Sequence, residues 1–145
     1  MVDSREQTPF DLSPMTSLTG TLYTGDYSVN GLEGVIALER KSLADLVACC
    51  GRERERFERE LMRLKAYAVS AVTIESSWQE LERGEWRSKI TPNQVLGSLT
   101  AWMAQGHTII VAGNRDMAQR VCRSILFHAA KYRWRENQRM IGAKV

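Results

Sequence analysis

Residues 35–41, Val-Ile-Ala-Leu-Glu-Arg-Lys, begin as an apolar run and end in three charged side chains. Such a short apolar run, bounded by polar residues, predicts a β-strand. Ser42 follows at once as a helix N-cap, and Ser42-Leu-Ala-Asp45 resembles a capping box with Asp in place of Glu. The segment therefore predicts a strand that leads directly into a helix.

The charged end of this strand has a pattern that suits phosphodiester chemistry. Strand side chains alternate between faces, so Glu39 and Lys41 share one face and Arg40 points to the other. A carboxylate can hold a divalent ion, which polarises a phosphoryl group and lowers the pKa of a bound water. The lysine can orient that water or stabilise charge on the phosphorus. An isolated Glu-x-Lys pair is also common on edge strands without any chemical role, so a second carboxylate is needed, and Asp26 is the nearest.

A shared site for Asp26 and Glu39 requires a particular hairpin. Asn30-Gly31 is a strong turn signal between residues 21–29 and the strand. A two-residue turn there would leave the two carboxylates four residues out of register, roughly 13 Å apart at about 3.3 Å per residue. The shared site therefore requires a longer loop that extends toward Gly34, or a bulge near Gly25, and we predict the longer loop.

The rest of the chain has the alternating pattern of an α/β domain. Residues 76–90 are expected to be irregular, with Trp78 and Trp86 more suited to anchoring a loop than to stacking on bases. The order βββαβαβα predicts a central mixed β-sheet flanked by α-helices. The predicted elements are strands at residues 1–3, 21–29, 35–41, 68–75 and 108–112, a helix from Ser42 that pauses at Gly51, a helix from Thr91 and a last helix capped by Asn114.

Composition places the chain among globular proteins of one domain. Its 145 residues are 43% hydrophobic and 26% charged, with a formal net charge of +3. The apolar runs are far too short to cross a bilayer, and residues 1–6 lack the apolar stretch of a signal peptide. We expect a protein of the cytoplasm of a bacterial or phage-infected cell, or one associated with the nucleoid.

The cysteines and histidines lack the spacing of a zinc site. Cys49 and Cys50 are adjacent, Cys122 is alone, and His107 and His128 lie far apart. Oxygen ligands remain, which points to magnesium or manganese.

The end of the chain is basic. Aromatic side chains interleave with the cations there, a pattern that suits contact with nucleic acid and equally suits a solvated helix end. The cations are Lys131, Arg133, Arg135, Arg139 and Lys144.

Three motifs in order resemble the XPF-type nucleases, the structure-specific endonucleases of DNA repair and recombination. That family carries a Gly-Asp pair and then Glu-Arg-Lys, with an Asp four residues after the Lys. The matching segments here are Val2-Asp-Ser-Arg-Glu6, Gly25-Asp-Tyr27 and Glu39-Arg-Lys-Ser42 with Asp45, followed more loosely by Thr73-Ile-Glu75 and residues 92–132. The resemblance thus covers nearly the whole chain.

The resemblance implies a restriction-endonuclease-like core in residues 1–136, followed by a basic C-terminal tail at 137–145. It implies a DNA endonuclease dependent on Mg²⁺ or Mn²⁺ that acts on branched or flapped DNA in recombination or repair. By position, Asp26, Glu39 and Asp3 would be metal ligands and Lys41 the catalytic lysine. The remaining predicted site residues are Arg5 and Glu6 as further catalytic groups, Arg40 and Asp45 as supporting groups, and Arg5, Lys131, Arg133 and Arg135 as DNA contacts.

Two other functions fit the same residues. One is a catalytically inactive DNA-binding subunit of a nuclease complex, and the other is a Holliday-junction resolvase built on the same core. Family members often carry a second DNA-binding module, and we expect none within these 145 residues. We therefore expect a homodimer, paired through the helix at residues 114–135, or partner proteins that supply DNA specificity.

Overall fold

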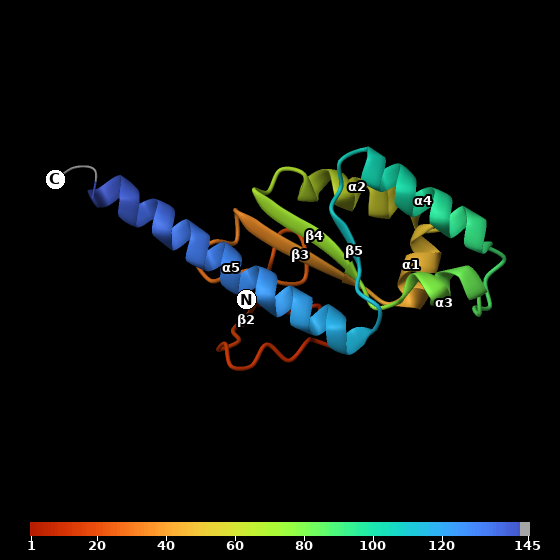
Figure 1. Ribbon diagram of the computed structural model, residues 1–145, viewed down its shortest axis with the longest axis horizontal. Helices are drawn as coiled ribbons and strands as arrows, with labels where there is room; N and C mark the ends of the chain where they lie inside the picture. Colours follow the sequence, from red (N-terminus) through yellow and green to blue (C-terminus); the bar gives the residue numbers. More distant parts are fainter. Residues whose placement is uncertain (143–145) are drawn as a thin grey trace.

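A computed structural model describes residues 1–142, and the last three residues of the predicted tail lie outside it. Its centre is a sheet of three parallel strands in the order β3 (Ile36–Lys41), β4 (Val69–Ile74) and β5 (Ile109–Val111). Helices connect these strands in sequence, which is the connection that parallel pairing requires. Figure 1 shows the three strands side by side between two layers of helices. The predicted α/β architecture is confirmed.

The N-terminal segment adds an irregular margin to the sheet. The short strands β1 (Val2–Asp3) and β2 (Thr19–Gly20) pair in parallel, and Tyr27 bridges them to β3 through antiparallel contacts with Val2 and Leu38. The sheet is therefore mixed, as predicted. The predicted strand at residues 21–29 is wrong, because only Tyr27 within it makes ladder contacts.

The helices begin where the sequence places their caps, with one addition. They are α1 (Leu43–Cys49), α2 (Arg54–Leu64), α3 (Trp78–Arg83), α4 (Pro92–Ala104) and α5 (Arg115–Gly142). Helix α3 lies in the stretch predicted to be irregular. A reciprocal capping box between Ser77 and Glu80 stabilises its first turn, and Gly84 ends it in the left-handed conformation. Trp86 anchors the following loop by donating to the Ile90 carbonyl oxygen at 2.7 Å.

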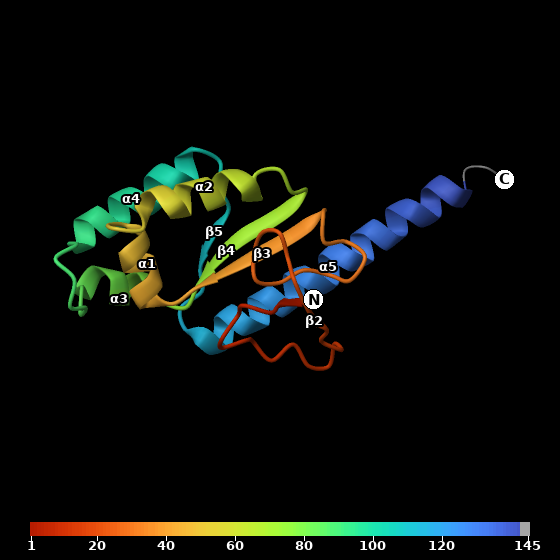
Figure 2. The same ribbon diagram turned by 180° about the vertical axis from the view of Figure 1, so that it is seen from behind.

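Two apolar clusters hold the layers to the sheet. On one face α1, α2 and α4 cover alternate residues of β3 and β4, and on the other face α5 and the N-terminal segment cover the remaining ones (Figures 1 and 2). Phe57 and Trp102 pack edge to face in the first cluster, while Phe10 stacks on Tyr27 in the second. Glu39 and Lys41 share the face covered by α2.

Helix α5 is longer than the sheet it covers. Its first half packs on the sheet through Ala118, Cys122, Leu126 and Ala129. Its C-terminal half projects beyond the body, and there Trp134 is 62% exposed (Figure 1). The helix runs through position 136 without a break, and the division into a domain and a tail at that point stays a prediction. None of the helices in residues 1–142 combines the length and apolar character needed to span a bilayer.

Candidate active site

Asp26 and Glu39 line the same pocket because the hairpin has a long loop and a bulge. Asp26 and Tyr27 both donate their backbone N–H to the Leu38 carbonyl oxygen, at 2.8 and 3.0 Å. Two residues thus oppose one, which is the definition of a β-bulge. Because Tyr27 pairs with Leu38, the connecting loop extends past Gly34, and the bulge brings Asp26 to the part of β3 that contains Glu39. The predicted long loop is confirmed, and a bulge next to Gly25 is present as well.

Gly25 makes this approach possible. Its φ of 81° lies in the left-handed region, and a Cβ atom there would come within 2.9 Å of the Leu38 carbonyl oxygen. A larger residue would push Asp26 away from β3. The Gly-Asp pair is therefore required by backbone geometry.

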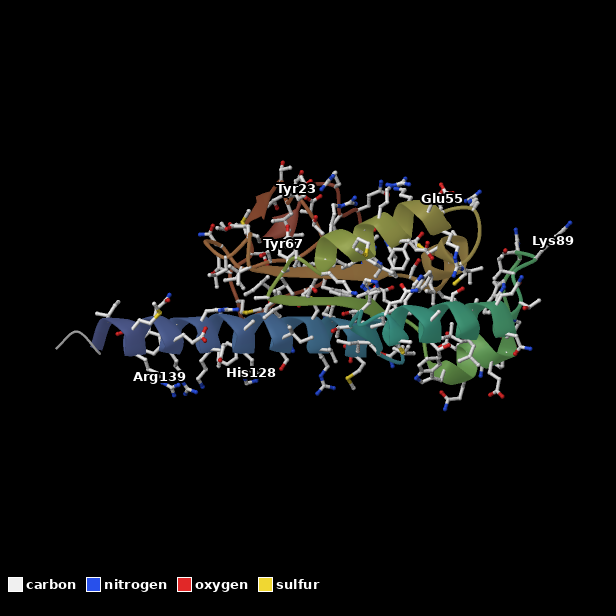
Figure 3. All side chains as sticks on the ribbon, turned by 90° about the horizontal axis from the view of Figure 1, so that it is seen from above. Tyr23, Glu55, Tyr67, Lys89, His128 and Arg139 are labelled. Atoms are coloured by element: carbon white, nitrogen blue, oxygen red, sulfur yellow. The ribbon has the colours of Figure 1, made fainter. Side chains whose placement is uncertain are left out.

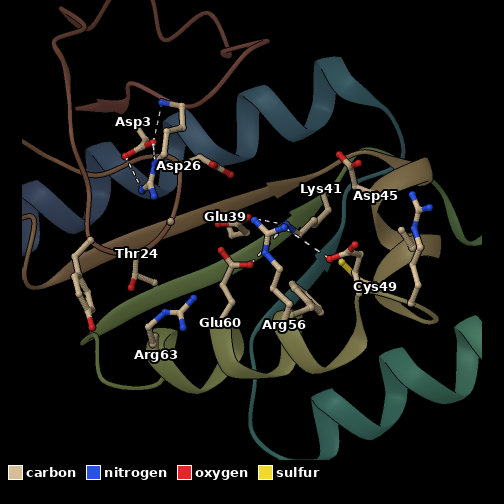
Figure 4. Close-up of a pocket in the computed structure, with 17 residues that line it drawn as sticks. Asp3, Thr24, Asp26, Glu39, Lys41, Asp45, Cys49, Arg56, Glu60 and Arg63 are labelled. Carbon is tan, nitrogen blue, oxygen red and sulfur yellow. Dashed lines mark hydrogen bonds and ion pairs between the residues drawn. The ribbon is translucent and has the colours of Figure 1, made fainter.

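Asp26, Glu39 and Lys41 meet in a pocket of about 480 Å³ between β3 and α2 (Figure 4). The Arg40 backbone N–H donates to Asp26 Oδ2 at 2.7 Å. Glu39 is 5% exposed, and its Oε1 accepts from Lys41 Nζ at 2.7 Å. Within residues 1–142, Glu39 Oε2 is buried without a hydrogen-bond partner. Lys41 Nζ also lies 3.7 Å from Oε2 of Glu60, which comes from α2.

Burial and mutual repulsion perturb the pKa of these groups. Burial raises the pKa of Asp26 to about 6. Burial and the nearby Asp26 charge raise the pKa of Glu39 well above its ordinary value. Burial alone would lower the pKa of Lys41, but Glu39 and Glu60 outweigh it and raise that pKa, so the ammonium stays charged. Three carboxyl groups, those of Asp26, Glu39 and Glu60, thus share the pocket with one ammonium.

The residues present fit a magnesium or manganese ion. The donors are carboxylate oxygens, which hard divalent cations prefer, and one of them is buried without a partner. No group of three or more His, Cys, Asp and Glu side chains in residues 1–142 converges closely enough to hold a metal alone. Magnesium usually takes one or two carboxylates and keeps several waters, which agrees with Asp26 and Glu39 as a pair.

Asp3 lines the same pocket but its oxygens are occupied. Oδ1 accepts from Arg5 N and Nε at 2.9 and 2.7 Å, and Oδ2 accepts from Arg5 Nη2 and Leu22 N at 3.1 and 2.7 Å. The hydrogen bonds from the Arg5 side chain outweigh burial and lower the pKa of Asp3 to about 2. In this arrangement Asp3 anchors the N-terminal loop, and its role as a metal ligand stays a prediction. Arg5, with a side chain 69% exposed, lies at the pocket rim.

Glu6 and Arg40 lie on the opposite side of β3 and do not line the pocket. Arg40 donates from Nε and Nη2 to the two oxygens of Glu6, each at 2.9 Å. Burial opposes ionisation of Glu6, but these bonds outweigh it and lower its pKa. Asp45 lies at the pocket rim, where its backbone N–H donates to the Ser42 hydroxyl at 3.2 Å. The structure thus separates Glu6 and Arg40 from the other predicted site residues.

The predicted DNA contacts on α5 lie apart from the pocket. Lys131, Arg133 and Arg135 belong to the projecting half of α5, and Arg133 pairs with Glu136 at 3.0 Å. His128, next to the buried Ala129, and Arg139, in the projecting half, both point away from the sheet (Figure 3).

The sequence reasoning missed the wall of the pocket that α2 provides. Arg56, Glu60 and Arg63 line it opposite the sheet residues (Figure 4), and Arg52, just before the helix, also lines the pocket. The charged stretch at residues 52–63 has the pattern of a helix face exposed to solvent. The same local pattern is expected whether the charged face meets bulk water or lines a polar pocket. The signal available in sequence was the helical spacing of Arg56, Glu60 and Arg63, next to the core stripe that begins at Phe57.

Comparisons with known proteins agree with this fold. The structure superposes on that of XPF from Aeropyrum pernix with a TM-score of 0.68 and 19% sequence identity, over 97% of this chain and 70% of that one. For XPF from Aeropyrum pernix in complex with DNA, the TM-score is 0.64 and the identity 20%, over 90% of this chain and 64% of that one. No curated protein sequence matches the chain. The ERCC4 domain model matches residues 2–123, most of the chain. The chain therefore belongs to the ERCC4-domain family, that of the XPF-type nucleases.

Proposed function

We propose that the chain is a divalent-metal-dependent DNA endonuclease whose active site is the pocket between β3 and α2. The observation that carries the proposal is the burial and incomplete hydrogen bonding of the Glu39 carboxylate. Its carboxylate is buried 2.7 Å from the Lys41 ammonium and in the same pocket as Asp26, and within residues 1–142 its Oε2 has no partner. Leaving a buried acceptor unsatisfied costs about 1–3 kcal/mol, and more for a charged group. A bound cation would supply the missing partner.

The pocket residues divide the work of phosphodiester hydrolysis. Asp26 and Glu39 would hold Mg²⁺ or Mn²⁺, which supplies charge neutralisation at the phosphoryl group and a water of lowered pKa. Lys41 keeps its proton because its pKa is raised, so the ammonium is available to stabilise negative charge that develops on the phosphoryl oxygens. The water oxygen forms a new bond to phosphorus, the bond from phosphorus to the leaving sugar oxygen breaks, and that oxygen takes up a proton.

Basic side chains around the pocket support DNA as the substrate. Arg5, Arg52 and the α2 residues Arg56 and Arg63 place cations beside the carboxylates, where the phosphates of a bound strand would pass. The similar XPF from Aeropyrum pernix was solved in complex with DNA. We extend DNA binding to this chain, with branched or flapped DNA in recombination or repair as its substrate.

Helix α5 offers a surface for pairing or for additional DNA contact. Phe127 and Trp134 are exposed one heptad apart on the same side, with Lys131 between them. We propose a homodimer formed through this surface, and contact of Lys131, Arg133 and Arg135 with the DNA backbone outside the pocket.

The inactive-subunit alternative receives less support. A subunit that only binds DNA has no need of a buried, unpartnered carboxylate oxygen, which reduces stability. Glu39, Asp26 and Lys41 instead share one pocket. The Holliday-junction alternative uses the same chemistry and is separated only by substrate choice.

The test compares cleavage by the wild type, Asp26→Asn and Lys41→Ala on labelled duplex, flap, fork and four-way-junction DNA, with Mg²⁺, Mn²⁺ or EDTA. Matched controls are Asp116→Asn and Lys89→Ala, whose side chains are exposed and outside the pocket (Figure 3 labels Lys89). We expect metal-dependent cutting that the controls retain and that both site variants lose. Preference for four-way junctions over flaps would favour the resolvase. DNA binding without cutting under every condition would favour the inactive subunit.

A further inference from the structure

A network of charged side chains lies behind β3, on the side away from the pocket. Arg40 is its centre: besides its two bonds to Glu6, it donates from Nη2 to Thr8 Oγ1 at 2.7 Å and from Nη1 to Glu75 Oε1 at 3.1 Å. Arg115, from the first turn of α5, donates to the same Glu75 oxygen at 2.7 Å. The side chain of Glu75 is 11% exposed. The network therefore joins β3, the end of β4, the N-terminal loop and α5.

This network is connected to the pocket through the backbone of Arg40. The Arg40 N–H donates to Asp26 Oδ2 at 2.7 Å, and Glu39 and Lys41 flank Arg40 on the strand. A strand cannot rotate at one residue without turning its neighbours, because side-chain directions alternate along it. The position of the Arg40 side chain thus sets the direction of its own N–H and of both flanking side chains.

Glu75 holds the end of β3 by two independent contacts. Its backbone N–H donates to the Lys41 carbonyl oxygen at 2.9 Å, and its side chain accepts from the Arg40 guanidinium. Arg115 holds Glu75 in turn, and donates from Nη2 to the carbonyl oxygens of Thr8 and Pro9 at 2.7 and 3.1 Å. An apolar cluster of the same volume would provide comparable stability, so buried ions at this place call for another reason.

We propose that Glu75 and Arg115 are positioning residues that act through Arg40 to hold Asp26 and Glu39 in the orientation that binds the metal. The inference rests on the proposed function for the identity of the bound group. It adds that the first turn of α5 helps to determine the orientation of the metal ligands. Partners that position metal ligands commonly change metal affinity by about 10–100-fold when they are removed.

The experiment measures Mn²⁺ binding to the DNA-free protein by isothermal titration calorimetry. The variants are Glu75→Ala, Glu75→Gln and Arg115→Met. The matched control is Arg123→Met, because Arg123 is also an α5 arginine that donates to a carbonyl oxygen of the N-terminal loop, that of Ser13 at 2.7 Å, but it does not contact Glu75. The same samples are examined by hydrogen–deuterium exchange at the Arg40 amide, which requires no metal.

We expect Mn²⁺ to bind about tenfold more weakly to Glu75→Ala and Arg115→Met, and within about threefold of wild type to Glu75→Gln and Arg123→Met. Glutamine retains an acceptor oxygen for both arginines, so it rescues positioning while removing the charge. Exchange at the Arg40 amide should accelerate in Glu75→Ala and Arg115→Met only. If Glu75→Ala does not fold, Arg115→Met decides, since its side chain is partly exposed.

Unchanged Mn²⁺ affinity in Arg115→Met, or an equal loss in Arg123→Met, would overturn the inference. A wild type that binds no Mn²⁺ would instead refute the metal site of the proposed function. In that case the Arg40 amide still decides the positioning role: faster exchange in Arg115→Met than in Arg123→Met supports it, and equal exchange overturns it.

Discussion

Lys41→Met is expected to destabilise the protein, because it leaves Glu39 buried without its cation. Lys41 Nζ is 2.7 Å from Glu39 Oε1 and lies 5.2 Å from the centroid of the Phe57 ring. Methionine keeps most of the aliphatic packing against that ring and removes only the charge. Breaking a buried ion pair by removing one partner costs about 3–5 kcal/mol when the remaining group stays ionised.

The loss should increase with pH. Burial and the Asp26 charge already raise the pKa of Glu39 in the folded protein, and the Lys41 charge opposes this rise. Without Lys41 the folded pKa rises further, while the unfolded value stays ordinary. A carboxyl with a raised folded pKa costs stability increasingly as pH rises from the unfolded pKa to the folded one. We therefore expect the two proteins to differ little where Glu39 is protonated in both, and by about 3 kcal/mol at the pH where Glu39 is ionised in the folded wild type.

The assay is urea denaturation between pH 5 and 8 in EDTA, with the free energy of unfolding as the readout. A loss of about 3 kcal/mol corresponds to a melting temperature lower by roughly 6–12 °C for a domain of this size. The double variant Glu39→Gln/Lys41→Met contains neither charge and should recover most of the stability. A loss independent of pH, or a double variant as unstable as Lys41→Met, would refute the reasoning.

Three further predictions concern other parts of the chain. Gly25→Ala should lower the free energy of unfolding by at least about 1–3 kcal/mol and reduce cleavage, because alanine is strained at φ 81° and meets the Leu38 carbonyl oxygen. The control in thermal unfolding is Gly34→Ala, because Gly34 has open space around it. Equal effects of the two substitutions would contradict this geometry. Asp3→Asn should lower the free energy of unfolding by about 2 kcal/mol at pH 7, because hydrogen bonds from Arg5 lower the pKa of Asp3 from 3.8 to about 2. This contribution to stability is present above pH 4 and is lost as pH falls to 2. The denaturation curves of the variant and the wild type should therefore converge at pH 2. The double variant Lys131→Gln/Arg135→Gln should weaken DNA binding, measured by fluorescence anisotropy. The slope of the logarithm of the binding constant against the logarithm of the salt concentration should become shallower by about one to two units. An unchanged slope would exclude this half of α5 from the DNA interface.

The elements that could be predicted are those with strong local signals. Ser42, Thr91 and Asn114 each cap a helix as expected, and their side-chain oxygens accept backbone N–H groups of the first turn. The apolar runs of β3 and β4 likewise appear as strands. In contrast, β2 is two residues long, and it depends on pairing with the distant β1. Helix α3 is only six residues long, and its Ser77–Glu80 capping box is the one local signal for it.

The candidate site was predictable only in part. The Glu-x-Lys alternation places Glu39 and Lys41 on one face from sequence alone. The distance argument on the hairpin then required a loop or bulge, which the pairing of Tyr27 with Leu38 provides. The part played by Glu60 was not predictable, because its distance from Lys41 depends on how α2 packs across the sheet.

Periodicities, caps and the order of the motifs follow from the sequence alone, because each depends on residues within a few positions of one another. Which charges meet depends on the folded chain. Arg40 and Arg115 lie tens of residues from Glu75 in the sequence, yet both donate to the same Glu75 oxygen behind β3. Asp3 and Asp26 look equivalent in sequence, but hydrogen bonds lower the pKa of Asp3 and burial raises that of Asp26. The physical reason is that solvation and pairing of a charge depend on what packs around it, and the fold supplies those neighbours.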